Sequence, residues 1–133
     1  MLYEYRLETP KEGFIDITNE VRDACRQSGV FDGMLTVYCP HTTAGVTINE
    51  NTDPEAKNDL LLALNKTYPD REDFRHADGN SAAHLKASVI GSSVTIMIDD
   101  GEPVLGARQA VYFAEFDGPR SRRFTVKVMG SRN

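Results

Sequence analysis

Strict alternation of apolar and polar side chains near both ends of the chain restricts its fold more than any other feature. In residues 2–9, tyrosine or leucine takes one face and glutamate or arginine the other. Residues 94–98 and 124–128 repeat the pattern with valine, isoleucine and phenylalanine on one face. A period of two is typical of strands with one buried face and not of helices. The chain is therefore expected to begin and end in a β-sheet.

Three segments between these strands are predicted helices: residues 18–28, 54–66 and 81–90. Each begins with or follows a residue whose side chain can cap a helix amino terminus. Proline at position 54 favours a first helical turn, and glycine follows the first and third segments. The predicted caps are Thr18, Asp53 and Ser81.

The remaining strands are expected at residues 14–17, 34–39, 44–49 and 107–116. Residues 34–39 are almost continuously apolar, which is typical of a strand covered on both faces. Strands that follow one another late in the chain, without strict alternation with helices, favour an α+β fold. We expect one domain over residues 1–133, with a mostly antiparallel sheet or sandwich-like core and two or three helices outside.

Composition excludes several classes of function. The net charge of −5 argues against general binding to nucleic acid. The basic cluster Arg120, Arg122 and Arg123 is expected to be a solvated turn. No apolar run approaches the roughly 18 residues of a membrane span. The chain starts without a signal-peptide pattern, so Cys25 and Cys39 are interpreted as reduced thiols of a cytoplasmic protein.

The chain has three histidines, and each lies in a polar, turn-rich context. His41 follows the apolar strand 34–39, His76 lies in the polar segment 69–80, and His84 lies one turn into the helix that follows. Three neutral imidazoles with one open position form a common catalytic zinc site. Their spacing does not require this, and three independent surface histidines remain the alternative.

Polar side chains also gather just before the second predicted helix. Asn49 and Glu50 are candidates to orient a metal-bound water or a substrate hydroxyl. The alternative is that residues 51–53 serve ordinary turn and cap chemistry, an interpretation that we adopt for Asp53.

A possible anion site precedes the third predicted helix. Free backbone N–H groups near Asn80 and the Ser81 hydroxyl are suited to an anion, and Lys86 lies five residues after Ser81. Plain capping by Ser81 is the alternative.

Gln109 and Glu115 share one face of the strand 107–116, whose two faces are both largely apolar. Partly buried polar groups of this kind need partners. A site floor, a subunit contact or an exposed strand end would each supply them.

An ordered set of segments resembles the YjbQ-like, secondary thiamine-phosphate synthase family. They are residues 41–51 (HTTAGVTINEN), 53–54 (DP), 79–88 (GNSAAHLKAS), 91–93 (GSS) and 115–120 (EFDGPR). The segments follow the family's order and span most of the chain. One departure is at residues 105–110, where the family commonly has LGTWQG and this chain has LGARQA. Arg108 and Ala110 there put the substrate preference in question.

The resemblance implies a compact α+β homotrimer in which His41, His76 and His84 are ligands of a bound metal. It also implies weak formation of thiamine phosphate from a pyrimidine diphosphate and a thiazole phosphate, with loss of diphosphate. That reaction does not need three imidazoles, which suit Zn²⁺ better than Mg²⁺. Mg²⁺ remains the alternative if the synthase activity is the true one.

The leading hypothesis is a metal-assisted transferase or hydrolase acting on a small phosphorylated compound. Glu50 and His84 are its candidate catalytic residues. The alternative is a non-catalytic trimeric module that binds a metal or a small anion. The candidate residues for the substrate or anion are Thr42, Asn49, Asn80, Ser81, Lys86, Gln109 and Glu115.

Overall fold

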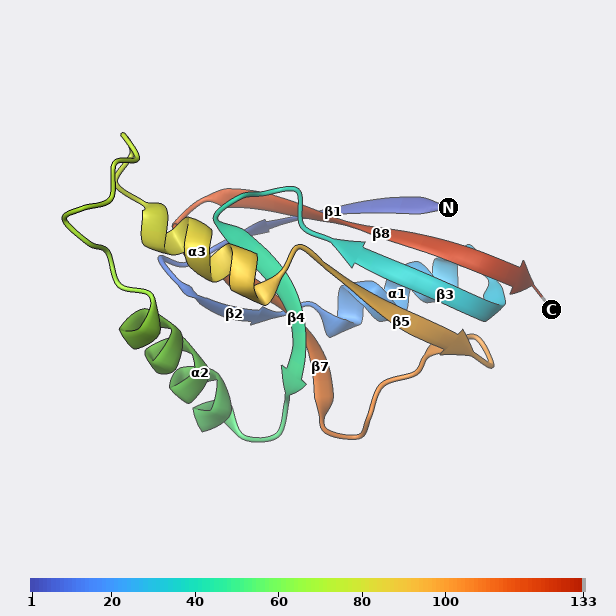
Figure 1. Cartoon of the computed structure of the whole chain (residues 1–133). Helices are drawn as coiled ribbons and strands as arrows, with labels where there is room; N and C mark the ends of the chain where they lie inside the picture. The colour runs from blue at the N-terminus through green and yellow to red at the C-terminus, as the bar shows by residue number, and fades with distance from the viewer. Residues whose placement is uncertain (133) are drawn as a thin grey trace.

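A computed structural model describes residues 1–132 as an α+β fold of two antiparallel sheets and three helices (Figure 1). The strands are β1 (Leu2–Glu8), β2 (Gly13–Asp16), β3 (Val30–Tyr38), β4 (Ala44–Glu50), β5 (Ser93–Asp99), β6 (Glu102–Pro103), β7 (Gln109–Glu115) and β8 (Ser121–Arg132). The helices are α1 (Thr18–Ser28), α2 (Pro54–Thr67) and α3 (Ser81–Ile90). The predicted fold class is confirmed.

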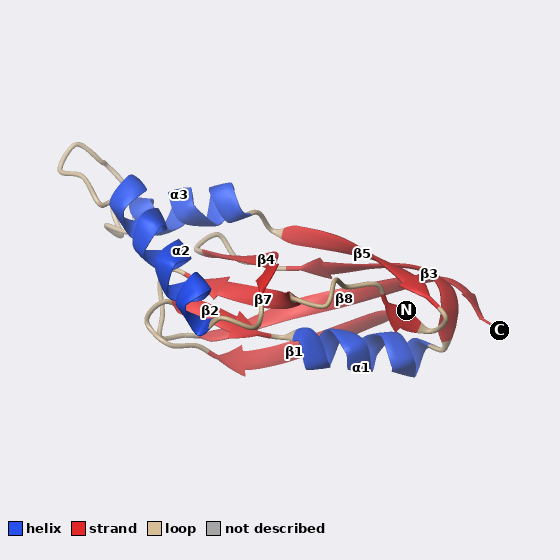
Figure 2. Ribbon diagram, turned by 90° about the horizontal axis from the view of Figure 1, so that it is seen from below, coloured by secondary structure: helices blue, strands red, loops and turns tan. Residues whose placement is uncertain are grey.

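The larger sheet has the strand order β1-β8-β3-β5-β6, and the smaller has the order β2-β7-β4. The first and last long strands pair directly, with Tyr3 opposite Val126. The smaller sheet's β4 and β7 run across the long strands β3, β5 and β8 (Figure 1). Helix α1 lies against one half of the sheets, and α2 and α3 gather at the other end (Figure 2).

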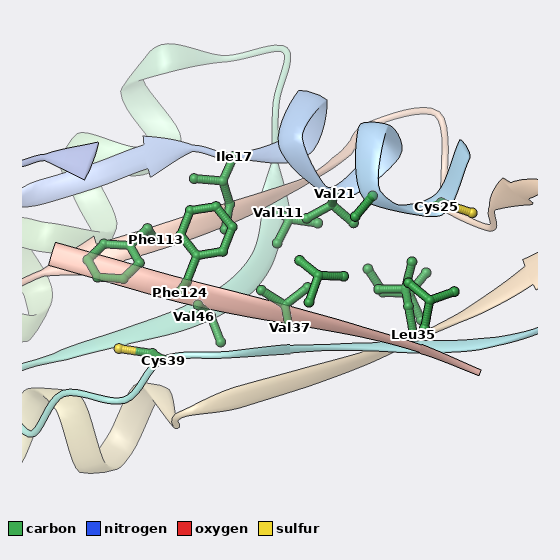
Figure 3. Packing of buried hydrophobic residues seen from close by; sticks show 14 of the residues in the cluster. Ile17, Val21, Cys25, Leu35, Val37, Cys39, Val46, Val111, Phe113 and Phe124 are labelled. Atoms are coloured by element: carbon green, nitrogen blue, oxygen red, sulfur yellow. The ribbon is translucent and has the colours of Figure 1, made fainter. Parts of the chain in front are cut away.

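The main core lies where the smaller sheet and α1 cover the inner face of the larger sheet. Val37 and Phe124 from the larger sheet meet Phe113 from the smaller sheet and Val21 from α1, all at most 1% exposed (Figure 3). A second cluster around Phe116 packs α2 and α3 on the outer face of the smaller sheet. Burial of apolar surface in these two clusters is the main contribution to the stability of the fold.

Only one of the three predicted caps forms. The Asp53 carboxylate accepts a hydrogen bond from the Glu55 N–H at 3.0 Å, so it caps α2 as predicted. The prediction for Thr18 is wrong, because its hydroxyl accepts from the Val111 N–H at 2.9 Å and so serves the neighbouring strand. The prediction for Ser81 is also wrong, because the N-cap residue of α3 is Asn80, whose side chain makes no cap hydrogen bond, and the Ala82 N–H donates instead to the Asp70 carboxylate at 3.3 Å.

Strand β3 is covered on one face only, which corrects the expectation of two. Leu35 and Val37 point into the core, whereas Met34 and Tyr38 are 49% and 47% exposed. Met34 pairs with Met97 of β5 on one side and with Met129 of β8 on the other. These three methionines form an exposed row across the larger sheet, called here the methionine surface.

No helix in the described part of the chain, residues 1–132, is long and apolar enough to cross a membrane.

Candidate functional site

Two of the three histidines line one pocket between α3 and the loop that joins β3 to β4. The pocket has a volume of about 440 Å³ and is lined by polar residues together with Ala44, Ala87 and Gly91. We call it the histidine pocket, and its polar residues are His41, Thr42, His84, Ser88 and Ser92.

The end of α3 is held close to β4, and this contact shapes the pocket. The Val46 N–H donates to the Gly91 carbonyl at 3.1 Å, and the Cys39 N–H donates to the Ser92 carbonyl at 2.8 Å. A Cβ at Gly45 would lie 2.5 Å from the Gly91 carbonyl oxygen, so only glycine permits this approach. Segments 39–45 and 91–92 are therefore fixed relative to each other.

The backbone of Arg123 fixes the ring of His41. His41 Nε2 lies 3.0 Å from the Arg123 amide nitrogen and 3.1 Å from its carbonyl oxygen. Nε2 accepts a hydrogen bond from the Arg123 N–H when the ring proton is on Nδ1; in the other tautomer Nε2 donates to the Arg123 carbonyl and leaves the Nδ1 lone pair free. Burial and the nearby Arg122 charge lower the pKa of His41. A neutral His41 is therefore favoured, which is the form that binds metals.

His76 reaches His84 from the exposed loop before α3. The two ring centroids lie 5.0 Å apart, with the rings nearly perpendicular. His76 Nε2 also lies 3.7 Å from a carboxylate oxygen of Asp78. Within residues 1–132, no group of three or more histidine, cysteine, aspartate or glutamate side chains is arranged to hold a metal ion. His84 is therefore close to both other histidines. It lines the same pocket as His41, and its ring lies beside the ring of His76.

Glu115 lies in the interior and pairs with Arg122. The Arg122 guanidinium donates to both carboxylate oxygens, at 2.7 and 2.6 Å, and to the Thr43 hydroxyl at 2.8 Å. Thr9 donates a further hydrogen bond to Glu115 at 2.6 Å. Burial alone would raise the pKa of Glu115, but these hydrogen bonds outweigh it and hold the pKa below the usual value.

Arg122 is only 6% exposed, so interpreting residues 120–123 as a wholly solvated turn was wrong. The alternation of β8 turns Arg122 inward with Phe124, while Arg123 faces outward. The partners expected for a buried Glu115 are therefore Arg122, Thr9 and the Asp117 N–H within the chain.

Asn49, Glu50 and Gln109 lie at the opposite end of β4 from the histidine pocket. Glu50 pairs with Gln109 in the sheet, whereas Ala44, beside the pocket, pairs with Glu115. Six strand residues of about 3.3 Å each separate the two ends, or about 20 Å.

Arg108 contacts the Glu50 carboxylate, with Nη2 at 3.0 Å and Nε at 3.2 Å. Hydrogen bonds from Thr52 and from Arg108 lower the pKa of Glu50. Glu50 is therefore an ionised carboxylate near neutral pH, paired with the arginine at which this chain departs from the family pattern.

Asn80 and Lys86 line a separate cavity on the other side of α3. Its volume is about 350 Å³, and its walls come from the β1–β2 loop, the end of α2, the start of α3 and the segment after β7. His84 and Lys86 are two residues apart and therefore point about 200° apart around the helix. Ser81, at the first position of α3, is half-buried and lines neither cavity.

The candidate site residues therefore do not share one pocket. Most of them lie in the histidine pocket, in the cavity around Lys86 or at the Glu50 end of β4, whereas Ser81 and Glu115 lie in none of these places. Ser88 and Ser92 also line the histidine pocket but are not among the residues predicted from the sequence. Ser88 lies one helical turn after His84, so helical spacing would have indicated it. Ser92 has no such pattern, because only the contact between α3 and β4 brings it to the pocket.

The arrangement defines an antiparallel α+β sandwich with polar cavities on both sides of one helix. The chain belongs to the family described as UPF0047 protein YjbQ-like, whose model matches residues 3–131. UPF0047 protein MJ1081 of Methanocaldococcus jannaschii is 49% identical, with 99% of this chain and 96% of the relative covered. UPF0047 protein YugU of Bacillus subtilis is 46% identical, with 98% and 100% covered.

Solved structures share the fold over nearly the whole chain. A YjbQ/UPF0047 family protein from Clostridium acetobutylicum has 53% identity and a TM-score of 0.93, with 96% of this chain and 99% of that chain covered. A YbjQ-like protein from Sulfolobus solfataricus has 26% identity and a TM-score of 0.94, with 98% and 97% covered.

Proposed function

We propose that this chain is a metal-assisted transferase or hydrolase that acts on a small phosphorylated compound at the histidine pocket. The observation that carries the proposal is the placement of the three histidines. His41 and His84 line one pocket, and the ring of His76 lies 5.0 Å from that of His84. His76 and His84 are neighbours in sequence, whereas His41 comes from the distant β3–β4 loop, so its position on the same pocket as His84 is set by the fold.

The donor set fits a transition metal better than it fits Mg²⁺. Zinc binds imidazole nitrogen at about 2.0–2.1 Å, which places two rings on one tetrahedral ion about 5 Å apart, centre to centre. The His76–His84 spacing of 5.0 Å matches this value. Adding His41 requires movement of the His76 loop or of the side chains, since no set of three acidic, cysteine or histidine groups in residues 1–132 is already arranged around an ion.

A bound Zn²⁺ would supply a Lewis acid for a phosphoryl oxygen or would activate a water molecule. His41 and His84 would hold it, and His76 would be the third ligand. The Arg123 carbonyl would orient the ring of His41 through Nε2–H, as backbone carbonyls commonly do for metal-bound histidines. Thr42, Ser88 and Ser92 would contact the substrate, because their side chains line the same pocket.

Thiamine-phosphate synthase activity is the specific reaction that the family resemblance suggests. It is the less favoured form of the proposal, because departure of diphosphate is usually assisted by Mg²⁺ bound to oxygen ligands. Glu50 receives no role at the metal in this proposal, since β4 separates it from the histidine pocket by about 20 Å.

Metal content is the direct test. The purified wild-type protein is expected to contain near-stoichiometric zinc by elemental analysis after equilibration and dialysis. His84→Ala should lose this metal, because His84 is the residue shared by the pocket and the His76 ring. Leu85→Ala is the matched control, since Leu85 is exposed on the same helix and should leave the metal content unchanged. Full metal retention in His84→Ala would refute the ligand assignment.

A non-catalytic metal- or anion-binding module is the second candidate. It is favoured by one observation: the residues that line the histidine pocket in the described chain include no acid or base other than the histidines. This candidate predicts tight ligand binding without turnover across a panel of phosphorylated compounds. Saturable turnover that His84→Ala abolishes would count against it.

We also propose that the chain assembles as a homotrimer, as the family resemblance implies. The methionine surface supports self-assembly, since Met34, Met97 and Met129 are 49%, 62% and 57% exposed in a contiguous row. Exposed apolar surface of this kind often marks contacts between proteins. The cytoplasmic location expected from the reduced thiols remains part of the proposal.

A further inference from the structure

The cavity beside Lys86, called here the lysine cavity, contains two polar groups that the chain itself leaves incompletely satisfied. The first is the ammonium of Lys86. Lys86 is 6% exposed, and its Nζ donates one hydrogen bond, to the Asn65 side-chain oxygen at 2.5 Å. Its Nζ also lies 5.5 Å from the centre of the Phe116 ring.

Lys86 has no ionic partner in the described chain. No carboxylate of residues 1–132 lies within 4.0 Å of its Nζ. An ammonium has three donors, and lysine is rarely this buried without a counter-ion. The cavity wall therefore presents a buried positive charge with hydrogen-bond donors to spare, which favours an anionic ligand.

The second group is the side-chain oxygen of Asn80. Asn80 Nδ2 donates to an Asp117 carboxylate oxygen at 2.8 Å, which fixes the orientation of the amide. Exchanging the amide nitrogen and oxygen would place two acceptors against each other, so this network settles the assignment. The Asn80 Oδ1 atom is buried and has no hydrogen-bond partner in residues 1–132. A ligand that satisfies it must carry an N–H or O–H donor.

The acidic residues of the cavity further restrict the ligand. Asp70 accepts from the Ala82 N–H at 3.3 Å, and Glu12 accepts from the Asn65 amide at 3.0 Å. Together with Asp117, these carboxylates oppose an anion that carries only acceptors. They tolerate an anion that offers a donor of its own. A protonated phosphate has both properties, whereas sulfate at neutral pH has acceptors only.

We propose that the lysine cavity binds a phosphate group that retains a P–OH donor or lies beside a ligand hydroxyl. Lys86 binds the phosphate oxygens, and Asn80 Oδ1 accepts the hydrogen bond from the donor. The volume of about 350 Å³ suits a small phosphate monoester as well as free phosphate. The proposal does not rest on a metal at the histidine pocket.

Titration of the whole protein in the presence of a chelator tests the proposal. Calorimetry at pH 7 with inorganic phosphate, glycerol phosphate and sulfate should show saturable binding of both phosphates. Sulfate should bind at least about tenfold more weakly, because it leaves Asn80 Oδ1 unsatisfied. Tighter binding of glycerol phosphate would identify an ester as the ligand, and the reverse order would identify free phosphate. Equal binding of sulfate, or absence of saturable phosphate binding, would overturn the proposal.

Two variants locate the binding. Lys86→Met should weaken phosphate binding by about tenfold or more, because it removes the charge but keeps the side-chain length. Asn80→Ser should reduce the preference for phosphate over sulfate, and it carries the test if Lys86→Met does not fold. Lys127→Met, at an exposed position on β8, is the control and should bind phosphate as wild type does. Unchanged binding in both cavity variants would refute the site.

The outcomes separate this proposal from the metal hypothesis. Phosphate binding that disappears with the chelator would place the anion at a metal and overturn the lysine cavity as its site. Phosphate binding that persists after the chelator has removed zinc would support the lysine cavity, and the zinc content of the protein before chelation tests the histidine pocket separately.

Discussion

The buried pair Glu115–Arg122 holds the loop that carries His41. Arg122 binds the Thr43 hydroxyl at 2.8 Å, and the adjacent Arg123 backbone contacts His41 Nε2. Glu115 therefore acts on the histidine pocket through Arg122 and Thr43, as a positioning residue. Its carboxylate is fully buried and already bound by Arg122, Thr9 and a backbone N–H.

Glu115→Gln is expected to destabilise the protein by about 3–5 kcal/mol, because it leaves the Arg122 charge buried without a partner. Chemical denaturation measures this loss. Glu8→Gln, at an exposed position of β1, is the matched control and should change the free energy of unfolding by less than about 0.5 kcal/mol. A loss below about 1 kcal/mol for Glu115→Gln would show that water reaches Arg122.

The same pair predicts a pH dependence. The pKa of Glu115 is lower in the folded protein than its ordinary value of 4.5, so the unfolded chain binds the proton more readily. The stabilisation is complete above about pH 4.5 and is lost as the pH falls through the folded pKa. The stability difference between wild type and Glu115→Gln should therefore shrink between pH 7 and pH 3. An equal difference at both pH values would contradict the assignment.

At the scale of elements, the hydrophobic pattern predicted the strands and helices well, whereas the caps required tertiary information. The two-residue alternation in residues 2–9 is enough by itself to predict a strand, and β1 forms there. Thr18 had the chemistry of a cap, but β7 passes beside it and takes its hydroxyl through the Val111 N–H. Asp53 has no such competitor and caps α2.

Asp53→Ala should therefore lower the free energy of unfolding by about 0.5–2 kcal/mol, because it removes the side-chain acceptor of the Glu55 N–H. Ser81→Ala is the matched comparison, since its hydroxyl caps nothing, and it should cost no more than a few tenths of a kcal/mol. Thermal or denaturant unfolding measures both. A larger loss for Ser81→Ala than for Asp53→Ala would contradict the observed capping.

Across the whole molecule, no pattern in the sequence indicates how the candidate site residues are grouped in space. His84 and Lys86 are close in sequence, yet the turn of α3 directs them into different cavities. Glu50 and His41 are joined by a short segment, yet β4 extends that segment across the sheet. Arg122 and Glu115 come together because the end of β7 lies beside the start of β8, which no local pattern reveals.

Assembly into a trimer is a property of the whole molecule that can be tested at the methionine surface. If the methionine surface is a subunit contact, the double substitution Met34→Lys and Met97→Lys should convert the trimer to monomer, because it would bury two positive charges in an apolar contact. Light scattering measures the molar mass. Lysine in place of Leu62, an exposed residue of α2, is the control and should leave the trimer intact. A wild-type monomer at all concentrations would refute the proposed assembly.

The most direct test of the metal hypothesis is crystallography of the zinc-equilibrated protein, with anomalous scattering recorded on both sides of the zinc edge. The metal hypothesis predicts an anomalous peak in the histidine pocket, with nitrogen atoms of His84, His41 and His76 at about 2.0–2.1 Å. A map without a peak there, with the imidazoles bonded only to the protein or to solvent, would contradict it.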